Sequence, residues 1–394
     1  MNAQNNRLQA GSCSADDRTP AFLRGELDPQ RSHIWYFDWL RLFAMLAVIF
    51  MHAASGFLRG QITRGWHAAN LLTSISFTAV PLFFMMSGAL LLSDERTPDV
   101  KLLLRRRMPR ILLPLFFYSI IAVLWLWYRD GPTGRPMIPA LLMGLNKPVY
   151  VHLWFLYTLA GLYLISPFLY RMVHALDAKL ERYLLLLLGA VVLLDLLRAF
   201  APAAWRPYFQ WRIAEDLKLF GGHLFAFLLG YYLHRARRKI STGVLLAAAL
   251  VIWATIAAGT YCQYHRTGEL DSGFMSQNGG WELLLAACLF LTAKQTLNHP
   301  RRKPELPGVA LAMPIYLSHN LILSYLNWRF LRPDRFLEVA AIWALTATIS
   351  LVVSKTLTTV PGLCYLSSGM SFQKACAHAN WIAAIRELKR KNGR

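Results

Sequence analysis

The stretch Asp38-Trp-Leu-Arg41-Leu-Phe-Ala-Met-Leu-Ala-Val-Ile-Phe-Met-His52-Ala-Ala-Ser-Gly56 decides the fold of this chain. It is long and apolar enough to cross a bilayer, since a membrane helix needs about 20 mainly apolar residues. At about 100° per residue, its three ionisable side chains lie within roughly 60° of one another. A charge in hydrocarbon costs at least about 2.5 kcal/mol, so this stripe should face a bundle interior or a wet cavity.

The same stripe has a direction along the membrane normal. A helix rises about 1.5 Å per residue, so His52 lies roughly 16 Å deeper than Arg41. Met45 and Ile49 share the stripe between them. The pattern therefore predicts a path for a long anionic ligand, from a cationic mouth at the membrane edge to an imidazole inside.

The composition agrees with a membrane protein. The chain has 394 residues, of which 56% are hydrophobic, and a formal net charge of +21. Soluble domains hold about 45–50% apolar residues. A soluble protein this basic would suggest nucleic acid, but the basic residues here lie in short segments between apolar runs, as in polytopic membrane proteins. We expect no nucleic-acid partner and no bound cofactor. The five cysteines form no CxxC pair, and no cluster has metal-ligand spacing, so we expect no metal.

The apolar runs predict an all-α polytopic protein with about ten transmembrane helices. We place them at about 38–56, 70–92, 111–128, 152–170, 183–199, 217–234, 243–262, 280–297, 306–327 and 336–360. Most lysines and arginines fall in the termini and the even-numbered loops, which predicts that both termini are cytoplasmic. Residues 1–33 are interpreted as a flexible cytoplasmic tail, 34–366 as the membrane domain and 367–394 as a basic cytoplasmic tail, in which 381–391 resembles a surface-bound amphipathic helix.

Two prolines and one glycine modify these spans. Pro81 predicts a kink in the second span, and Ser87-Gly88 predicts close approach of another helix. Pro314 precedes His319 by five residues, and a break there would free backbone groups to line a cavity.

Several short motifs, in this order, resemble a known family. They are Phe37-Asp38-Trp-Leu-Arg41 with His52; Pro81-Leu-Phe-Phe-Met-Met-Ser87-Gly88; Arg106-Arg107-Met-Pro-Arg110; His152-Leu-Trp154-Phe-Leu-Tyr157; and Ile315-Tyr316-Leu-Ser-His319-Asn. Together they resemble the acyltransferase-3 family of bacterial integral membrane acyltransferases over about 34–366. The likeness is to the short members that O-acetylate surface polysaccharides, of the enterobacterial common antigen O-acetyltransferase type.

The resemblance implies a function and several site residues. It implies a multi-pass protein of the bacterial inner membrane that takes acetyl-CoA, or another acyl-CoA, as co-substrate from the cytoplasm. The acyl group would pass to a hydroxyl of a surface glycan or of its lipid-linked sugar precursor. The essential Arg and His of the family fall on Arg41 and His52, and its basic third-span motif falls on Arg106, Arg107 and Arg110. Many members carry a fused extracytoplasmic hydrolase-like domain, and we expect none in this chain.

The chemistry needs a base, a stabilised thioester oxygen and an aligned donor. His52 can act as the base, because histidine titrates near neutral pH, or it can carry the acyl group transiently; alternatively it is a buried histidine bonded to a carbonyl. Arg41 can bind the phosphates of coenzyme A, or it can snorkel to the membrane edge. Asp38 can hold Arg41 at i,i+3, as part of the catalytic set or as a structural ion pair.

The remaining candidates also have two readings each. Arg106, Arg107 and Arg110 suit bidentate phosphate contacts, but the positive-inside rule and anionic lipids call for the same residues. His319 is a candidate second polar group for the acceptor or the acyl oxygen, or a packing histidine. His152 and Trp154 are candidates for the acceptor site, although the aromatic belt also explains the tryptophan.

A transporter that exports a glycan or lipid precursor is the rival class. About ten spans, a kinked helix and intramembrane charges also fit a transporter, but the sequence shows no inverted repeat. A non-catalytic scaffold for a polysaccharide machine is a third interpretation.

Overall fold

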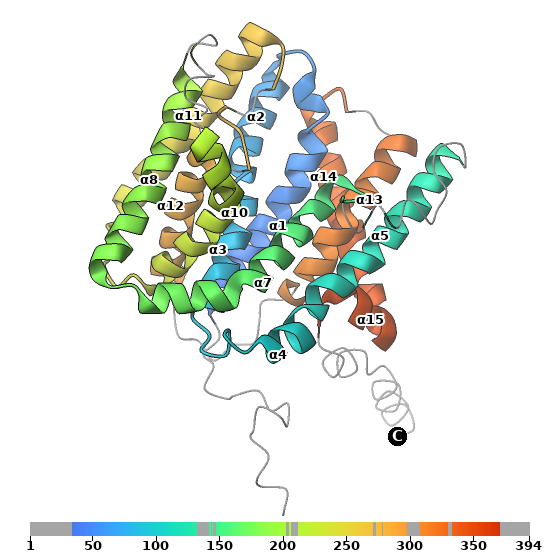
Figure 1. Ribbon diagram of the computed structural model, residues 1–394. Helices are drawn as coiled ribbons and strands as arrows, with labels where there is room; N and C mark the ends of the chain where they lie inside the picture. The colour runs from blue at the N-terminus through green and yellow to red at the C-terminus, as the bar shows by residue number, and fades with distance from the viewer. Residues whose placement is uncertain are drawn as a thin grey trace, which may run out of the picture.

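The computed structural model describes residues 34–131, 142, 144, 147–201, 205, 212–270, 273–277, 279–297, 308–329 and 333–370, and these residues form helices without a strand (Figure 1). The long helices are α1 (Trp35–Ala54), α2 (Arg64–Ser76), α3 (Ala79–Leu92), α5 (Pro109–Asp130), α7 (Trp154–Ala175), α8 (Ala178–Phe200), α10 (Arg212–Arg235), α11 (Thr242–Thr267), α12 (Gly280–Leu297), α13 (Ala312–Arg329) and α14 (Phe336–Thr359). The short ones are η2 (Phe57–Arg59), α4 (Val100–Leu102), the π-helical turn η3 (Leu103–Arg107), η4 (Val151–Leu153), η5 (Val309–Leu311) and α15 (Pro361–Ser368). The predicted tail 1–33 and the predicted helix at 381–391 lie outside the described residues.

The described part of the chain holds eight helical segments that are long and apolar enough to cross a membrane. They confirm an all-helical, multi-pass membrane protein. One of the eight, Arg64–Leu92, combines α2 and α3. Helices α10 and α12 are not among the eight, although both pack against α3 within the bundle. The number of about ten spans and the cytoplasmic side of the termini stay predictions.

Helix α1 is the centre of the bundle. Its most apolar stretch is 67% buried, whereas that of α8 is 11% buried and those of α11 and α14 are 22% buried. Helices α2, α3, α12, α13 and α14 all contact α1, and Figure 1 shows α8 and α11 toward one edge of the bundle and α5 toward the other. The ionisable residues on α1 are therefore placed inside protein rather than in lipid, as their cost in hydrocarbon requires.

Pro81 breaks the second span as predicted. Helix α2 ends at Ser76 and α3 begins at Ala79, so the break lies just before Pro81, which is the third residue of α3. Proline has no N–H, and its ring displaces the carbonyl of the residue four positions earlier, here Phe77. The Thr78 N–H and hydroxyl both donate to the Ile75 carbonyl, at 3.2 and 2.6 Å, so polar groups at the break are satisfied within the chain.

Pro314 has the same place in its span as Pro81. The 3₁₀ turn η5 ends at Leu311, just before α13 begins at Ala312, so the interruption lies immediately before the proline, and α13 then continues through His319 to Arg329. A proline is tolerated in the first turn, because the N–H groups there have no partner within the helix.

Helices α3 and α10 cross with their backbones in contact, as Ser87-Gly88 predicted. A Cβ on Gly88 would lie 1.8 Å from the carbonyl oxygen of Phe227, and a Cβ on Gly230 would lie 2.0 Å from that of Met85. Each helix thus contributes one glycine at the crossing. Small residues allow such close packing between membrane helices, where van der Waals contact drives association.

The start of α1 and the end of the described chain lie at the same end of the bundle. A 2.6 Å hydrogen bond joins the Tyr36 hydroxyl to Nδ1 of His234, near the end of α10. Gly369, just after α15, packs against the carbonyl of Arg110 at the start of α5. Figure 1 shows α4 and α15 at this same end. We call it the basic end, because Arg41, Arg107 and Arg110 lie there, and call the opposite one the far end.

Candidate active site

The charged stripe of α1 begins with a partly buried ion pair. Nη1 of Arg41 lies 3.4 Å from Oδ1 of Asp38, at the predicted i,i+3 spacing. The Asp38 side chain is fully buried, whereas that of Arg41 is 33% exposed. The carboxylate therefore holds one guanidinium nitrogen of Arg41, while a third of the Arg41 side chain stays accessible at the basic end.

Three arginines surround one tyrosine at the basic end. Arg41, Arg107 and Arg110 all interact electrostatically with the hydroxyl of Tyr163, which lies on α7. These residues come from three separate helical segments, so the tertiary fold concentrates positive charge there. Arg106, the remaining arginine of the predicted set, is exposed at its surface.

A π-helical turn aims Arg107 inward. The Met108 N–H donates to the carbonyl of Leu103, five residues earlier, at 2.9 Å. Arg107 then reaches Oδ2 of Asp94 at 2.8 Å and the hydroxyl of Thr97 at 2.9 Å. Such π turns are rare and occur often at functional sites.

Three histidines meet in the bundle toward the far end. The ring centroid of His319 lies 5.3 Å from that of His52 and 5.5 Å from that of His152. They come from α13, α1 and η4, which are far apart in sequence. His319 is fully buried, His152 is 1% exposed and His52 is partly exposed. The structure thus brings together three residues that the sequence had only proposed separately.

Backbone carbonyls fix the tautomers of the two deeper histidines. Nε2 of His152 donates to the carbonyl of Leu317 at 2.9 Å, and Nδ1 of His319 donates to that of Tyr316. A carbonyl only accepts, so these nitrogens carry the hydrogens when the rings are neutral. Nδ1 of His152 and Nε2 of His319 are then acceptors, and both are buried without a hydrogen-bond partner in the described part of the chain. Tyr316 also donates its hydroxyl to the carbonyl of His152 at 3.0 Å, which ties η4 to α13.

A cavity of about 920 Å³ begins at His52 and extends through the far end of the bundle. Its size falls in the range of small-molecule sites. Polar and aromatic side chains line it, from the segment after α1, the ends of α5 and α13, and the residues around η4: Ser55, Gln61, Thr63, Arg129, Tyr150, Asn320, Ser324, Asn327, Trp328 and Asp334 are among them.

The sequence predicted an open path along α1, but apolar side chains fill this path in the structure. Met45 is 6% exposed and Ile49 is fully buried, and both pack against Ala312 and Ile315 of α13. The stripe therefore faces another helix, as its charges require, but its middle is filled by apolar contact. Arg41 and His52 lie on opposite sides of this apolar plug.

Trp154, a predicted acceptor-site residue, lies away from the far-end cavity and beside His223. Trp154 stacks on His223 with ring centroids 5.0 Å apart, and His223 packs on Phe84 at 4.5 Å. Trp154 is not among the residues that line the far-end cavity.

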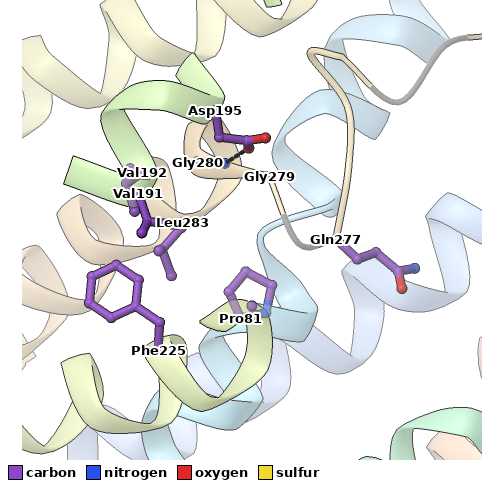
Figure 2. A pocket seen from close by; sticks show the side chains of 10 residues that line it. Pro81, Val191, Val192, Asp195, Phe225, Gln277, Gly279, Gly280 and Leu283 are labelled. Carbon is purple, nitrogen blue, oxygen red and sulfur yellow. Dashed lines mark hydrogen bonds between the residues drawn. The ribbon is translucent and has the colours of Figure 1, made fainter. Parts of the chain in front are cut away.

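A second cavity, of about 30 Å³, lies between α8, α10 and α12 (Figure 2). Oδ2 of Asp195 accepts a 2.8 Å hydrogen bond from the N–H of Gly280 at the start of α12, as the dashed line shows. Oε1 of Glu282 accepts from the N–H of Ser276 at 2.6 Å. Both acids thus lie at the N-terminal turn of α12, where negative charge is favourable. The cavity has room for about one water molecule.

Sequence reasoning missed three residues of this site. Tyr163 and Asp94 gave no signal of their own, because their partners are distant in the chain. Asn320 had one: it is a polar residue in an apolar span, next to His319.

The apolar helices, the buried charges and the far-end cavity define a multi-pass membrane protein with a candidate site inside its helix bundle. A profile of the acyltransferase domain of the acyltransferase-3 family matches residues 34–358. The chain belongs to this family and is a membrane acyltransferase. No curated protein and no solved structure matches the chain.

Proposed function

We propose that this protein is an O-acyltransferase of the bacterial inner membrane, which moves an acetyl group from cytoplasmic acetyl-CoA to a hydroxyl of a cell-surface polysaccharide or its lipid-linked precursor. It would then act like the short polysaccharide O-acetyltransferases that its motifs resemble. Acetyl-CoA is a co-substrate in this proposal and not a bound cofactor.

The position of His52 is the observation that carries the proposal. Its side chain lines the far-end cavity, and it lies eleven residues, or about 16 Å of helix, from Arg41. An enzyme that joins a cytoplasmic donor to an acceptor from the opposite side needs its reactive group between the two. The place of His52, on the cavity and beyond the apolar plug from Arg41, supports this role.

The basic end suits the donor. Coenzyme A carries several phosphate charges, and arginine binds phosphate through paired hydrogen bonds. Arg41 and the segment with Arg106, Arg107 and Arg110 supply four guanidinium groups in this region. The acyl chain must then pass Met45 and Ile49 to reach His52, so we expect the apolar plug to rearrange when the donor binds.

The far-end cavity suits a sugar. Its Asn, Gln, Ser and Thr side chains can bond hydroxyl groups, and the ring of Trp328 offers a face for stacking. Pockets for small molecules combine such placed polar groups with aromatic walls.

The residues around His52 suit general base catalysis. As the acceptor oxygen attacks the thioester carbon, His52 takes the hydroxyl proton; the C–S bond then breaks and the sulfur leaves with that proton as the free thiol of coenzyme A. The ring of His319 packs beside that of His52 with centroids 5.3 Å apart, and its Nε2, an acceptor because Nδ1 donates to the Tyr316 carbonyl, has no partner among the described residues.

The test is release of free coenzyme A from acetyl-CoA by sealed inside-out membrane vesicles, supplied with crude glycan. His52→Ala should abolish release while the protein still inserts and folds. His174→Ala is the matched control, because His174 is exposed, its Nδ1 donates to the Tyr170 carbonyl of its own helix, and it is not among the residues that line the cavity. Undiminished release by the His52 variant would sink the assignment, and no release by the intact protein with any acyl-CoA would favour the transporter.

A further inference from the structure

Asn320 has a buried donor that the protein leaves unused. The side chain is 7% exposed, and its Nδ2 has no hydrogen-bond partner among the described residues. Leaving a buried polar group unpaired costs about 1–3 kcal/mol, and native proteins hold few such groups. The position therefore calls for an explanation.

The surroundings of Asn320 supply that explanation. It lines the same cavity as His52, and it directly follows His319, whose ring contacts that of His52. Two hydrogen bonds hold α13 against η4 here. The Tyr316 hydroxyl donates to the His152 carbonyl, and Nε2 of His152 donates to the Leu317 carbonyl. A fixed N–H donor thus lies in the wall of the cavity where the base also lies.

Acyl transfer needs such a donor. When the acceptor oxygen bonds to the thioester carbon, the electron pair of the C=O bond moves to the carbonyl oxygen, which becomes an oxyanion. The pair returns as the C–S bond breaks and the sulfur leaves. A preorganised donor that meets the oxyanion stabilises this intermediate, and removing one such donor typically costs about 10²–10³ in rate. Neither the basic end nor the base supplies it.

We propose that Asn320 is a catalytic residue that donates a hydrogen bond from Nδ2 to the oxyanion formed on the acyl carbonyl. The inference rests on the proposed function, since it assigns a role within the same transfer. In this role the amide, which has no protein partner among the described residues, would donate to the oxyanion in the transition state.

The experiment compares kcat and KM for Asn320→Ala and Asn320→Asp with those of the intact protein in the coenzyme A release assay. Aspartate keeps the shape but removes the donor. Ser350→Ala is the control, because the Ser350 hydroxyl is likewise buried without a hydrogen-bond partner among the described residues but lies on α14, outside the cavity lining. We expect kcat to fall about 10²–10³-fold for the Asn320 variants, with KM for both substrates changed less than about threefold, and kcat of the Ser350 variant to stay near that of the intact protein.

Binding of a thioether analogue of acetyl-CoA, which cannot react, separates catalysis from structure. The Asn320 variants should bind it as the intact protein does. Loss of that binding, a kcat within a few-fold of normal, or an effect only on the KM of the acceptor would each overturn the proposal. These outcomes differ from failure of the proposed function, which would show as no release by the intact protein or as release independent of His52.

Discussion

The crossing of α3 and α10 gives a prediction whose size follows from the structure. Replacing Gly88 or Gly230 by alanine places a Cβ 1.8 or 2.0 Å from a carbonyl oxygen of the opposite helix, and real Cβ atoms stay at least 3.0 Å away. The obstacle is backbone and cannot rotate aside, so the helices must separate by about 1 Å. A gap of that size forfeits roughly half of the contact energy across it.

We expect each variant to lose about 3 kcal/mol, at the upper end of the usual cost of overpacking, and the melting temperature to fall by roughly 5 °C or more. The assay is size-exclusion thermostability of detergent-solubilised protein. Gly161→Ala and Gly189→Ala are the controls, because both lie in exposed helix positions where a Cβ meets nothing within 4 Å. There alanine should be neutral or stabilising. Melting of the Gly88 and Gly230 variants at the temperature of the intact protein would refute the close crossing.

Three further predictions concern the basic end. Arg41→Ala should raise KM for acyl-CoA at least tenfold. Asp38→Asn keeps the shape of the side chain but removes the charge that holds Arg41, so its KM should rise less. Equal KM values for the intact protein and both variants would contradict this prediction. Asp94→Ala should destabilise the protein by about 1–3 kcal/mol, because it leaves Arg107 without its 2.8 Å partner, whereas Glu95→Ala, at an exposed neighbour, should not change the melting temperature. Raising salt from 50 to 500 mM should increase KM for acyl-CoA several-fold, because screening weakens the attraction between arginines and phosphates, and a KM independent of salt would argue against a phosphate site.

The local features of this fold were predictable from the sequence. The Asp38–Arg41 pair, the break before Pro81 and the approach of a helix at Gly88 each depend on spacing within one segment. Helix geometry and the missing N–H of proline fix them before tertiary packing begins. The depth of His52 relative to Arg41 follows from the same rise per residue.

The parts that depend on a partner helix were not predictable. The charged stripe on α1 indicated that it faces the bundle, but not that Ala312 and Ile315 fill the space against Met45 and Ile49. Likewise, nothing in one sequence brings His152 and His319 beside His52, because three segments far apart in the chain must first dock. The exact place of the interruption before Pro314 also depends on packing, because packing decides where α13 begins.

The π turn at Leu103–Arg107 makes this segment sensitive to chain length in a way that its composition conceals. The turn contains one residue more than an α-helical turn would, so α4 and α5 belong to different helical phases. Deleting a single residue before the arginines, such as Leu104, would restore one continuous phase and rotate α4 and the segment before it by about 100° relative to Arg107 and α5. Every arginine would still be present and the net charge unchanged, yet Asp94 would no longer face Arg107. For this protein, the counting of residues between Asp94 and Pro109 matters as much as their identity.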